Sequence, residues 1–99
     1  MLTGKQKSHL RSMANTMDAI IQVGKGGATE TVVTAVDQAL TARELVKVRV
    51  LNNCLDPLDQ VTADLAKETG SHLVQTMGKI VLLYRPNPEN PVINLPGQA

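Results

Sequence analysis

The stretch from Val23 to Thr29 constrains the fold most, because it places three glycines in four positions between two segments of different pattern. The apolar run 19–23 before it predicts a short β-strand, and the helical pattern 29–43 after it predicts a helix with Thr29 as its N-cap. Glycine permits backbone angles that a side chain forbids, and it lets another backbone come close. The chain is therefore predicted to run from a strand through a glycine loop (residues 24–27) directly into a helix.

The glycine loop has the chemistry of an anion site. Free backbone N–H groups, the positive end of the helix dipole and the ammonium group of Lys25 would converge there. The spacing matches neither the Walker pattern G-x-x-x-x-G-K-[ST] nor the Rossmann pattern G-x-G-x-x-G. The alternative is a tight turn whose glycines serve geometry only, and the loop by itself favours that alternative.

The rest of the sequence predicts the element order α-β-α-β-α-β-β. A capping box formed by Thr3 and Gln6 opens the first helix, and Asp56 as N-cap with Pro57 at the first helical position opens the third. Gly70 is the predicted C-cap of the third helix. The predicted helices are 3–15, 29–43 and 56–70, and the predicted strands are 19–23, 45–51, 72–77 and 80–85, with Gly78-Lys79 as a hairpin turn between the last two.

Alternation along the strand 45–51 predicts how the sheet is covered. Its valines point to one side, whereas Lys47 and Arg49 point to the other, which predicts one packed face and one face open to solvent. Right-handed crossovers would put the second and third helices on the same side, and the first helix must cover part of the sheet or an edge. The predicted core consists of Val32, Val33, Val36, Leu40, Leu58, Val61 and Leu65 packed against Val46, Val48 and Val50.

Composition excludes several classes of protein. The 99 residues make one domain, and with no Phe or Trp and a single Tyr84 its core must be aliphatic. RNA modules that stack bases on exposed aromatic side chains are thereby excluded. A single Cys54 excludes an intrachain disulfide and a cysteine-based zinc site. No signal peptide or membrane span is recognised, so a cytoplasmic location is the expectation.

No catalytic or metal site is predicted, and no cofactor is expected. His9 and His72 lie in separate elements without ligand spacing. Cys54 with a distant histidine could form a nucleophile and base, but a small residue in a loop is the simpler interpretation. An enzyme acting on a phosphorylated small molecule at the glycine loop remains a distant third hypothesis.

Charge is segregated along the chain although the net charge is only +1, which argues weakly against a nucleic-acid binder. Basic residues dominate 1–28 and the later strands, whereas acidic residues dominate 29–44 and 56–70. Such asymmetry indicates a face turned toward a polyanion. The alternative is a solvated surface with chance blocks of charge.

Five short stretches stand out by their order and spacing: Leu2–Lys7, Val23–Gly27, Ala42–Val48, Glu68–Gly70 and Gly78–Arg85. Together they resemble the YhbY family, whose members are single copies of the CRM domain. The resemblance covers residues 2–85, and Ala28 departs from it where a larger apolar residue is expected.

The resemblance implies a two-layer α/β sandwich similar to the C-terminal domain of translation initiation factor 3. It implies the strand order 1-2-4-3, with the fourth strand antiparallel to the others. The CRM domain would comprise residues 1–85, followed by a Pro-rich, flexible tail over 86–99. The family also implies an RNA-binding protein, expected to be a monomer, that acts on precursors of the large ribosomal subunit through a G-x-x-G loop.

The RNA contact is expected at the loop and an adjoining basic surface, reading backbone and shape with little base specificity. We expect Lys5, Lys7, Arg11 and Lys25 to form one surface continuous with the loop. The remaining alternative is a protein-interaction module that docks on a ribosomal or assembly protein through the basic sheet face. The candidate RNA-binding residues are Gly24, Lys25, Gly26, Gly27, Lys5, Lys7, Arg11, Lys47, Arg49, Lys79 and Arg85.

Two substitutions would test the loop. Glutamate at Gly27, or any bulky residue at Gly24, is expected to abolish RNA binding while the fold largely survives. The expected cause is a steric block combined with charge repulsion at a phosphate site.

Overall fold

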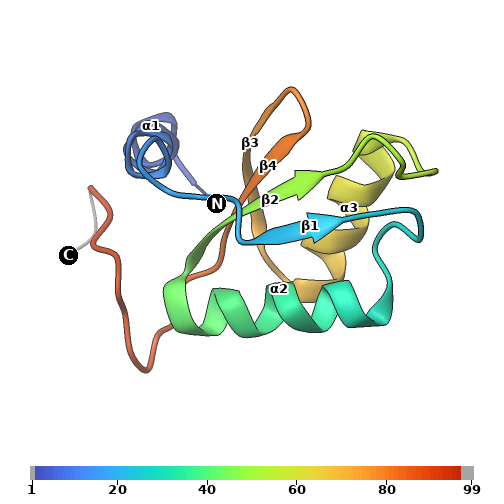
Figure 1. Cartoon of the computed structure of the whole chain (residues 1–99). Coiled ribbons are helices and arrows are strands. Elements are labelled where there is room, and N and C mark those ends of the chain that lie inside the picture. Colours follow the sequence, from blue (N-terminus) through green and yellow to red (C-terminus); the bar gives the residue numbers. More distant parts are fainter. Residues whose placement is uncertain (1, 97–99) are drawn as a thin grey trace.

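The computed structural model describes residues 2–96, which form one mixed sheet flanked by helices (Figure 1). The sheet has the order β1-β2-β4-β3; β1 is parallel to β2, and β4 is antiparallel to both of its neighbours. The predicted fold class, element order and strand order are thus confirmed. The elements are α1 (Gly4–Ala14), β1 (Ile21–Val23), α2 (Glu30–Arg43), β2 (Leu45–Val50), α3 (Leu58–Thr69), β3 (His72–Met77) and β4 (Ile80–Tyr84).

One face of the sheet is packed under α2 and α3, as the alternation in β2 predicts. Val36 and Leu40 of α2 and Val61 and Leu65 of α3 are fully buried in this layer. They pack on the three valines of β2 and on two residues of β4, while Val32, Val33 and Leu58 lie at the edge of the cluster, partly buried. The predicted aliphatic core is therefore confirmed.

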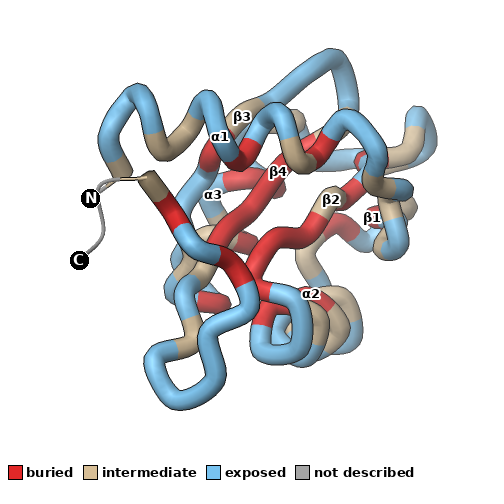
Figure 2. The backbone as a smooth tube through the Cα atoms, turned by 90° about the vertical axis from the view of Figure 1, so that its left-hand side faces the viewer, coloured by how far each residue is buried: buried red, intermediate tan, exposed pale blue. Residues whose placement is uncertain are grey.

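The opposite face is covered by α1 and the C-terminal segment, residues 86–96, as Figure 2 shows. Leu10 of α1 and Ile93 of the C-terminal segment are buried there with Leu45 and Tyr84. Burial and the nearby Glu44 carboxylate raise the pKa of Tyr84. The expectation that this face is open to solvent is wrong for most of its area, because α1 supplies a second apolar stripe that must also be buried.

Helix starts agree with the sequence in α1 and differ in α3. The capping box of α1 is present: Gln6 N donates to Thr3 Oγ1 over 3.1 Å, and Thr3 N donates to Gln6 Oε1 over 3.0 Å. In α3 the N-cap is Pro57, the helix begins at Leu58, and no side chain caps it. The assignment of Asp56 as N-cap is therefore wrong by one position, and the Asp56 carboxylate lies instead against the glycine loop.

The turns confirm the two glycines that the sequence places in special conformations. Gly70 ends α3 with φ of 64°, and Gly78 takes φ of 58° in the two-residue turn between β3 and β4. The strand β1 is shorter than predicted, since only Ile21–Val23 pairs with β2 and Ile20 is half exposed.

Residues 86–96 of the C-terminal segment lie against the domain, whereas the sequence predicts a flexible tail over 86–99, of which 97–99 lie outside the described residues. The carboxylate of Glu44, itself only 1% exposed, accepts hydrogen bonds from the backbone N–H groups of Asn87, Val92 and Ile93 over 2.5–2.6 Å. Burial alone would raise the pKa of Glu44, but these three donors outweigh it and hold the pKa below its ordinary value of 4.5. At the far end, Gln6 Nε2 donates to Pro96 O over 3.1 Å, which ties the segment to α1.

Candidate functional site

The glycine loop is a compact turn between β1 and α2. Gly27 N donates to Gly24 O over 3.1 Å, and Thr29 N donates to Gly27 O over 2.9 Å. Gly27 has φ of 69°, which is a left-handed conformation that residues with a side chain rarely adopt. Thr29 then caps α2 by accepting a hydrogen bond from Val32 N, as the sequence predicts.

The tip of the glycine loop presents unused donors to solvent. Lys25 and Gly26 are both exposed, and within residues 2–96 their backbone N–H groups make no hydrogen bond. They lie just before the N-terminus of α2, where the helix dipole favours negative charge. Two free N–H groups, a dipole end and an ammonium group are the components of a phosphate site.

A second loop, residues 51–57, lies beside the glycine loop. Leu51 N donates to Val23 O over 2.8 Å, which holds the starts of the two loops together. A Cβ on Gly24 would lie 3.9 Å from Asn53 Oδ1, whereas a Cβ on Gly27 would collide with the Asp56 carboxylate. The second loop therefore lies against the inner side of the glycine loop, and the exposed part of the loop is the Lys25–Gly26 tip.

The sequence carries a signal for the importance of this second loop. It follows the carboxyl end of β2, which is parallel to β1, and ligands of open α/β sheets bind outside the carboxyl ends of such strands. Asn52 and Asn53 are exposed there, and Leu55 is 74% exposed. The two loops therefore form one end of the molecule (Figure 1).

Two of the predicted cations, Arg49 and Lys79, lie at this same end of the sheet. Both are exposed, and together with Asn52 and Ile80 they line a hollow of about 450 Å³. Lys79 O accepts a hydrogen bond from Val50 N over 2.8 Å, so the β3–β4 turn is fixed onto the end of β2. The prediction that Arg49 is exposed on the face away from α2 is confirmed.

The cations of α1 do not adjoin the glycine loop. Figure 1 places α1 and the loop at opposite sides of the sheet, so the expected single surface of Lys5, Lys7, Arg11 and Lys25 is wrong. Arg11 instead lines a small hollow with Lys47 and Ile80, and Ile80 also borders the hollow of Arg49. Any basic path from α1 to the loops must therefore run over the ends of β2 and β4.

Two other candidate residues are engaged inside the domain. Lys47 is half-buried, and its Nζ donates to Ala14 O and Met17 O over 3.0 and 3.1 Å, which satisfies carbonyls at the end of α1. The expectation that Lys47 is exposed is therefore wrong. The guanidinium of Arg85 donates to both Asp37 and Thr41 of α2 and to the Thr69 carbonyl.

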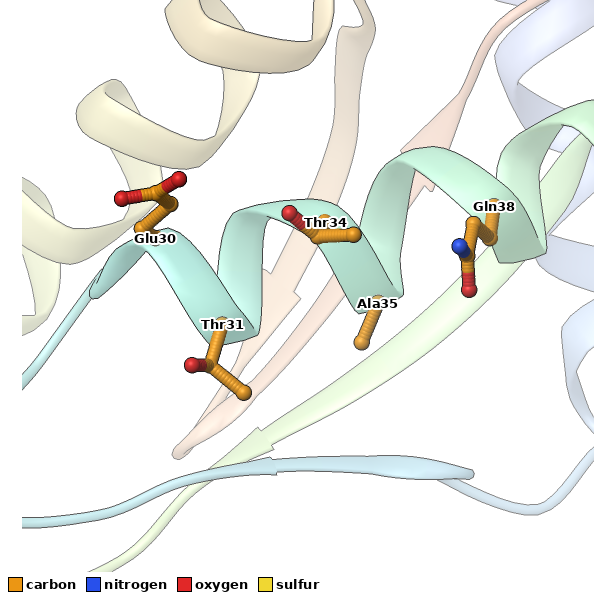
Figure 3. Close-up of a pocket in the computed structure, with 5 residues that line it drawn as sticks. All are labelled: Glu30, Thr31, Thr34, Ala35 and Gln38. Carbon is orange, nitrogen blue, oxygen red and sulfur yellow. The ribbon is translucent and has the colours of Figure 1, made fainter.

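The remaining chemistry does not converge on a second site. No group of three or more metal-ligating side chains is found among residues 2–96, and no helix in that range is long and apolar enough to span a membrane. A hollow of about 460 Å³ lies along α2, but Figure 3 shows that its side chains all come from this one helix, with Glu30 and Thr31 pointing in different directions. This hollow offers no cation and no pair of groups that could act together.

Comparison with known proteins places these features in a family. The model of the CRS1 / YhbY (CRM) domain matches residues 2–85. "Probable RNA-binding protein YqeI" of Bacillus subtilis is 48% identical over 96 residues, which cover 97% of this chain and all of that protein. An "RNA-binding protein" of Haemophilus influenzae is 35% identical over 88 residues, covering 89% of each chain.

A solved structure is similar to this chain in both fold and sequence. The solution structure of the hypothetical protein SAV1595 from Staphylococcus aureus is similar with a TM-score of 0.80 and 46% identity, covering 97% of this chain and all of that one. Since the family model spans nearly the whole chain and the relatives match over their full or nearly full length, the chain belongs to the CRS1/YhbY (CRM) domain family.

Proposed function

We propose that this protein binds structured ribosomal RNA and acts in assembly of the large ribosomal subunit, with the glycine loop holding the RNA backbone. The observation that carries the proposal is the exposed tip of this loop, where the N–H groups of Lys25 and Gly26 have no partner among residues 2–96. A phosphate would accept from both groups at the N-terminus of α2 and pair with the Lys25 ammonium group.

The names of the relatives support RNA as the ligand. The Bacillus subtilis and Haemophilus influenzae proteins carry RNA-binding in their names. The resemblance of a single domain to the YhbY family supports the large subunit and its precursors as the target, a monomeric protein and a cytoplasmic site of action. No catalytic step is proposed, since the exposed groups at this end of the molecule suit binding.

The interface extends from the glycine loop over the second loop to Arg49 and Lys79. These three parts lie at one end of the sheet and carry exposed cations and amides. Among the α1 cations, Arg11 is the best candidate for an outlying contact because its hollow adjoins that of Arg49. The engaged residues Lys47 and Arg85 are left out of the proposed contact.

The test compares two substitutions at Gly24, which has neither a positive φ nor a close neighbour. We expect Gly24→Glu to lower affinity for a protein-free large-subunit RNA fragment at least about tenfold, because it adds a negative charge next to the loop tip where the phosphate is proposed to bind. Gly24→Ala is the matched control and should bind within about threefold of wild type. Equal affinity of a folded Gly24→Glu protein would overturn the proposal.

A protein-docking module is the second candidate, and the edge strand β3 favours it. Leu73 and Met77 of this strand are 41% and 63% exposed, and an edge strand can pair with a partner chain. Salt-sensitive binding to protein-free RNA separates the two candidates, since docking on a ribosomal protein requires no RNA affinity. Absence of such binding, with retention on assembly particles, would favour the docking module.

A further inference from the structure

A row of three side chains crosses the sheet at the loop end. Arg49 of β2 lies directly opposite Ile80 of β4, and Ile80 lies directly opposite Met77 of β3. Directly opposite residues of antiparallel strands project from the same face, so these three side chains share one surface. Arg49 and Met77 are exposed, and Ile80 between them is partly buried.

Two residues of this row, Arg49 and Ile80, line a hollow at the same end of the sheet. The hollow of about 450 Å³ is lined by the end of β2, the first residues of the second loop and the β3–β4 turn. The turn is held in place by the bond from Val50 N to Lys79 O, and Gly78 provides the positive φ that the turn requires. The hollow is therefore shaped by backbone contacts before any ligand arrives, which lowers the cost of binding.

The lining combines an apolar surface with donors and contains no carboxylate. Ile80 and Leu51 contribute apolar atoms, while Arg49, Lys79 and Asn52 contribute donors. Within residues 2–96 the side chains of these three polar residues make no hydrogen bond. A ligand that fits this lining has a flat apolar face and an edge rich in acceptors.

We propose that this hollow holds one unpaired base, with guanine favoured, next to the backbone contact at the glycine loop. Guanine presents two neighbouring acceptors, N7 and O6, which match the donors of Arg49 or Lys79. At the corresponding edge adenine presents one acceptor, N7, beside an amino donor, and cytosine presents an amino donor, so neither offers two neighbouring acceptors to the cations. The base can stack on the Arg49 guanidinium and on Ile80, which replaces the aromatic platform that this chain lacks.

A phosphate bound in the hollow would contact its donors but not its apolar residues. Phosphate contacts need donors and charge, and the tip of the glycine loop already supplies both. An apolar floor beside the cations stabilises a base and contributes nothing to a phosphate. The RNA element inferred is a helix with an unpaired nucleotide beside it, its backbone at the glycine loop and its base in the hollow.

This inference rests on the proposed function, and the experiment separates the two. Affinity is measured for an RNA hairpin that carries a single bulged G, A, C or U, and for the same hairpin fully paired. Wild type should prefer the bulged G to the paired hairpin by roughly tenfold, the size expected of one good base contact. Wild type should also bind the hairpin with the bulged G more tightly than the hairpin with the bulged A.

Charge-conserving variants identify the hollow as the cause. Arg49→Lys keeps the positive charge but loses the planar guanidinium, so it should lose most of the preference for the bulged G over the paired hairpin. Asn52→Ala should reduce the preference in the same way. Arg43→Lys, an exposed arginine at the end of α2, is the control and should keep the full preference.

Each outcome decides between the two proposals. Equal affinity for paired and bulged RNA, with Gly24→Glu still weakening both, overturns the base site and leaves the proposed function standing. A preference for every bulge regardless of base overturns the guanine assignment. No salt-sensitive affinity for any of the RNAs overturns the base site and the proposed function together.

Discussion

The charged residues at the two ends of the sheet have opposite roles. Near the end of α2, Glu44 accepts three backbone hydrogen bonds and the Arg85 guanidinium donates to α2 and to the end of α3. At the loop end, Lys25, Arg49 and Lys79 are exposed, and their side chains make no hydrogen bond within residues 2–96. The hydrogen-bond partners, and not the charges, distinguish the structural end from the candidate binding end.

Removing the Glu44 carboxylate should give the largest effect on stability. Glu44→Ala leaves the N–H groups of Asn87, Val92 and Ile93 without their acceptor, and we expect the free energy of unfolding to fall by about 3 kcal/mol. Urea denaturation measures this change. Hydrogen exchange at Val92 and Ile93 should speed up more than exchange in the β2–β4 ladder, because the C-terminal segment is released first.

A matched variant shows whether the contact between Glu44 and the C-terminal segment depends on hydrogen bonding or on side-chain volume. Glu44→Gln keeps the shape and one carbonyl acceptor, so its loss should be smaller than that of Glu44→Ala. Per folded molecule, RNA affinity should be unchanged in both variants. A loss of RNA affinity equal to that of Gly24→Glu would contradict the separation of the two ends.

Gly27 should give the next largest effect, again on stability. Alanine at this position would have to adopt φ of 69° and would collide with the Asp56 carboxylate, so we expect Gly27→Ala to cost about 1–3 kcal/mol. Gly24→Ala, three residues earlier, should change stability by less than about 0.5 kcal/mol. Thermal unfolding of the two variants side by side measures the difference.

The earlier expectation for Gly27→Glu is corrected by the same geometry. Gly27 is buried, so a glutamate there would disturb the fold and would not report on RNA contact alone. Equal stability of Gly24→Ala and Gly27→Ala would show that the Asp56 contact does not constrain the loop.

Patterns within one element predicted its structure well, whereas contacts between distant segments could not be predicted. The strand order came from a family resemblance, and the buried face of β2 came from its alternating valines. The partners of Lys47 and Arg85 could not be predicted, because they lie 16 to 48 residues away in the sequence. Burial of an α1 stripe over the second sheet face was foreseeable, but the share contributed by the C-terminal segment was not.

Glu44 offered a signal that sequence reasoning missed. A helix ending at Arg43 and a strand beginning at Leu45 leave one residue to reverse the chain, and that residue is not glycine. Glu44 accordingly takes φ of 65°, and within residues 2–96 it is the one non-glycine residue with positive φ. Such strain persists only where surrounding contacts hold it, and here the three backbone donors do so.

Acid should weaken the contact between Glu44 and the C-terminal segment less than the Glu44→Ala substitution does. The pKa of Glu44 is lowered in the folded protein, so its contribution to stability is present in full above the unfolded value of about 4.5 and is lost as pH falls through the lower folded value. Wild type should therefore lose stability over this acidic window. Glu44→Gln should lose less over the same window, and parallel curves for the two proteins would show that other carboxyl groups are responsible.

Single-charge changes at the loop should give the smallest effect, and they test the comparison most finely. Each phosphate contact contributes about 0.7–0.9 to the slope of log K against log salt concentration. Lys25→Ala should flatten that slope by one such step, because Lys25 stands at the tip where the N–H groups are free. Lys67→Ala, an exposed lysine on α3, should leave the slope unchanged. If both variants flatten the slope equally, the attraction is spread over the whole surface. The contrast between the structural end and the candidate binding end then does not govern RNA binding.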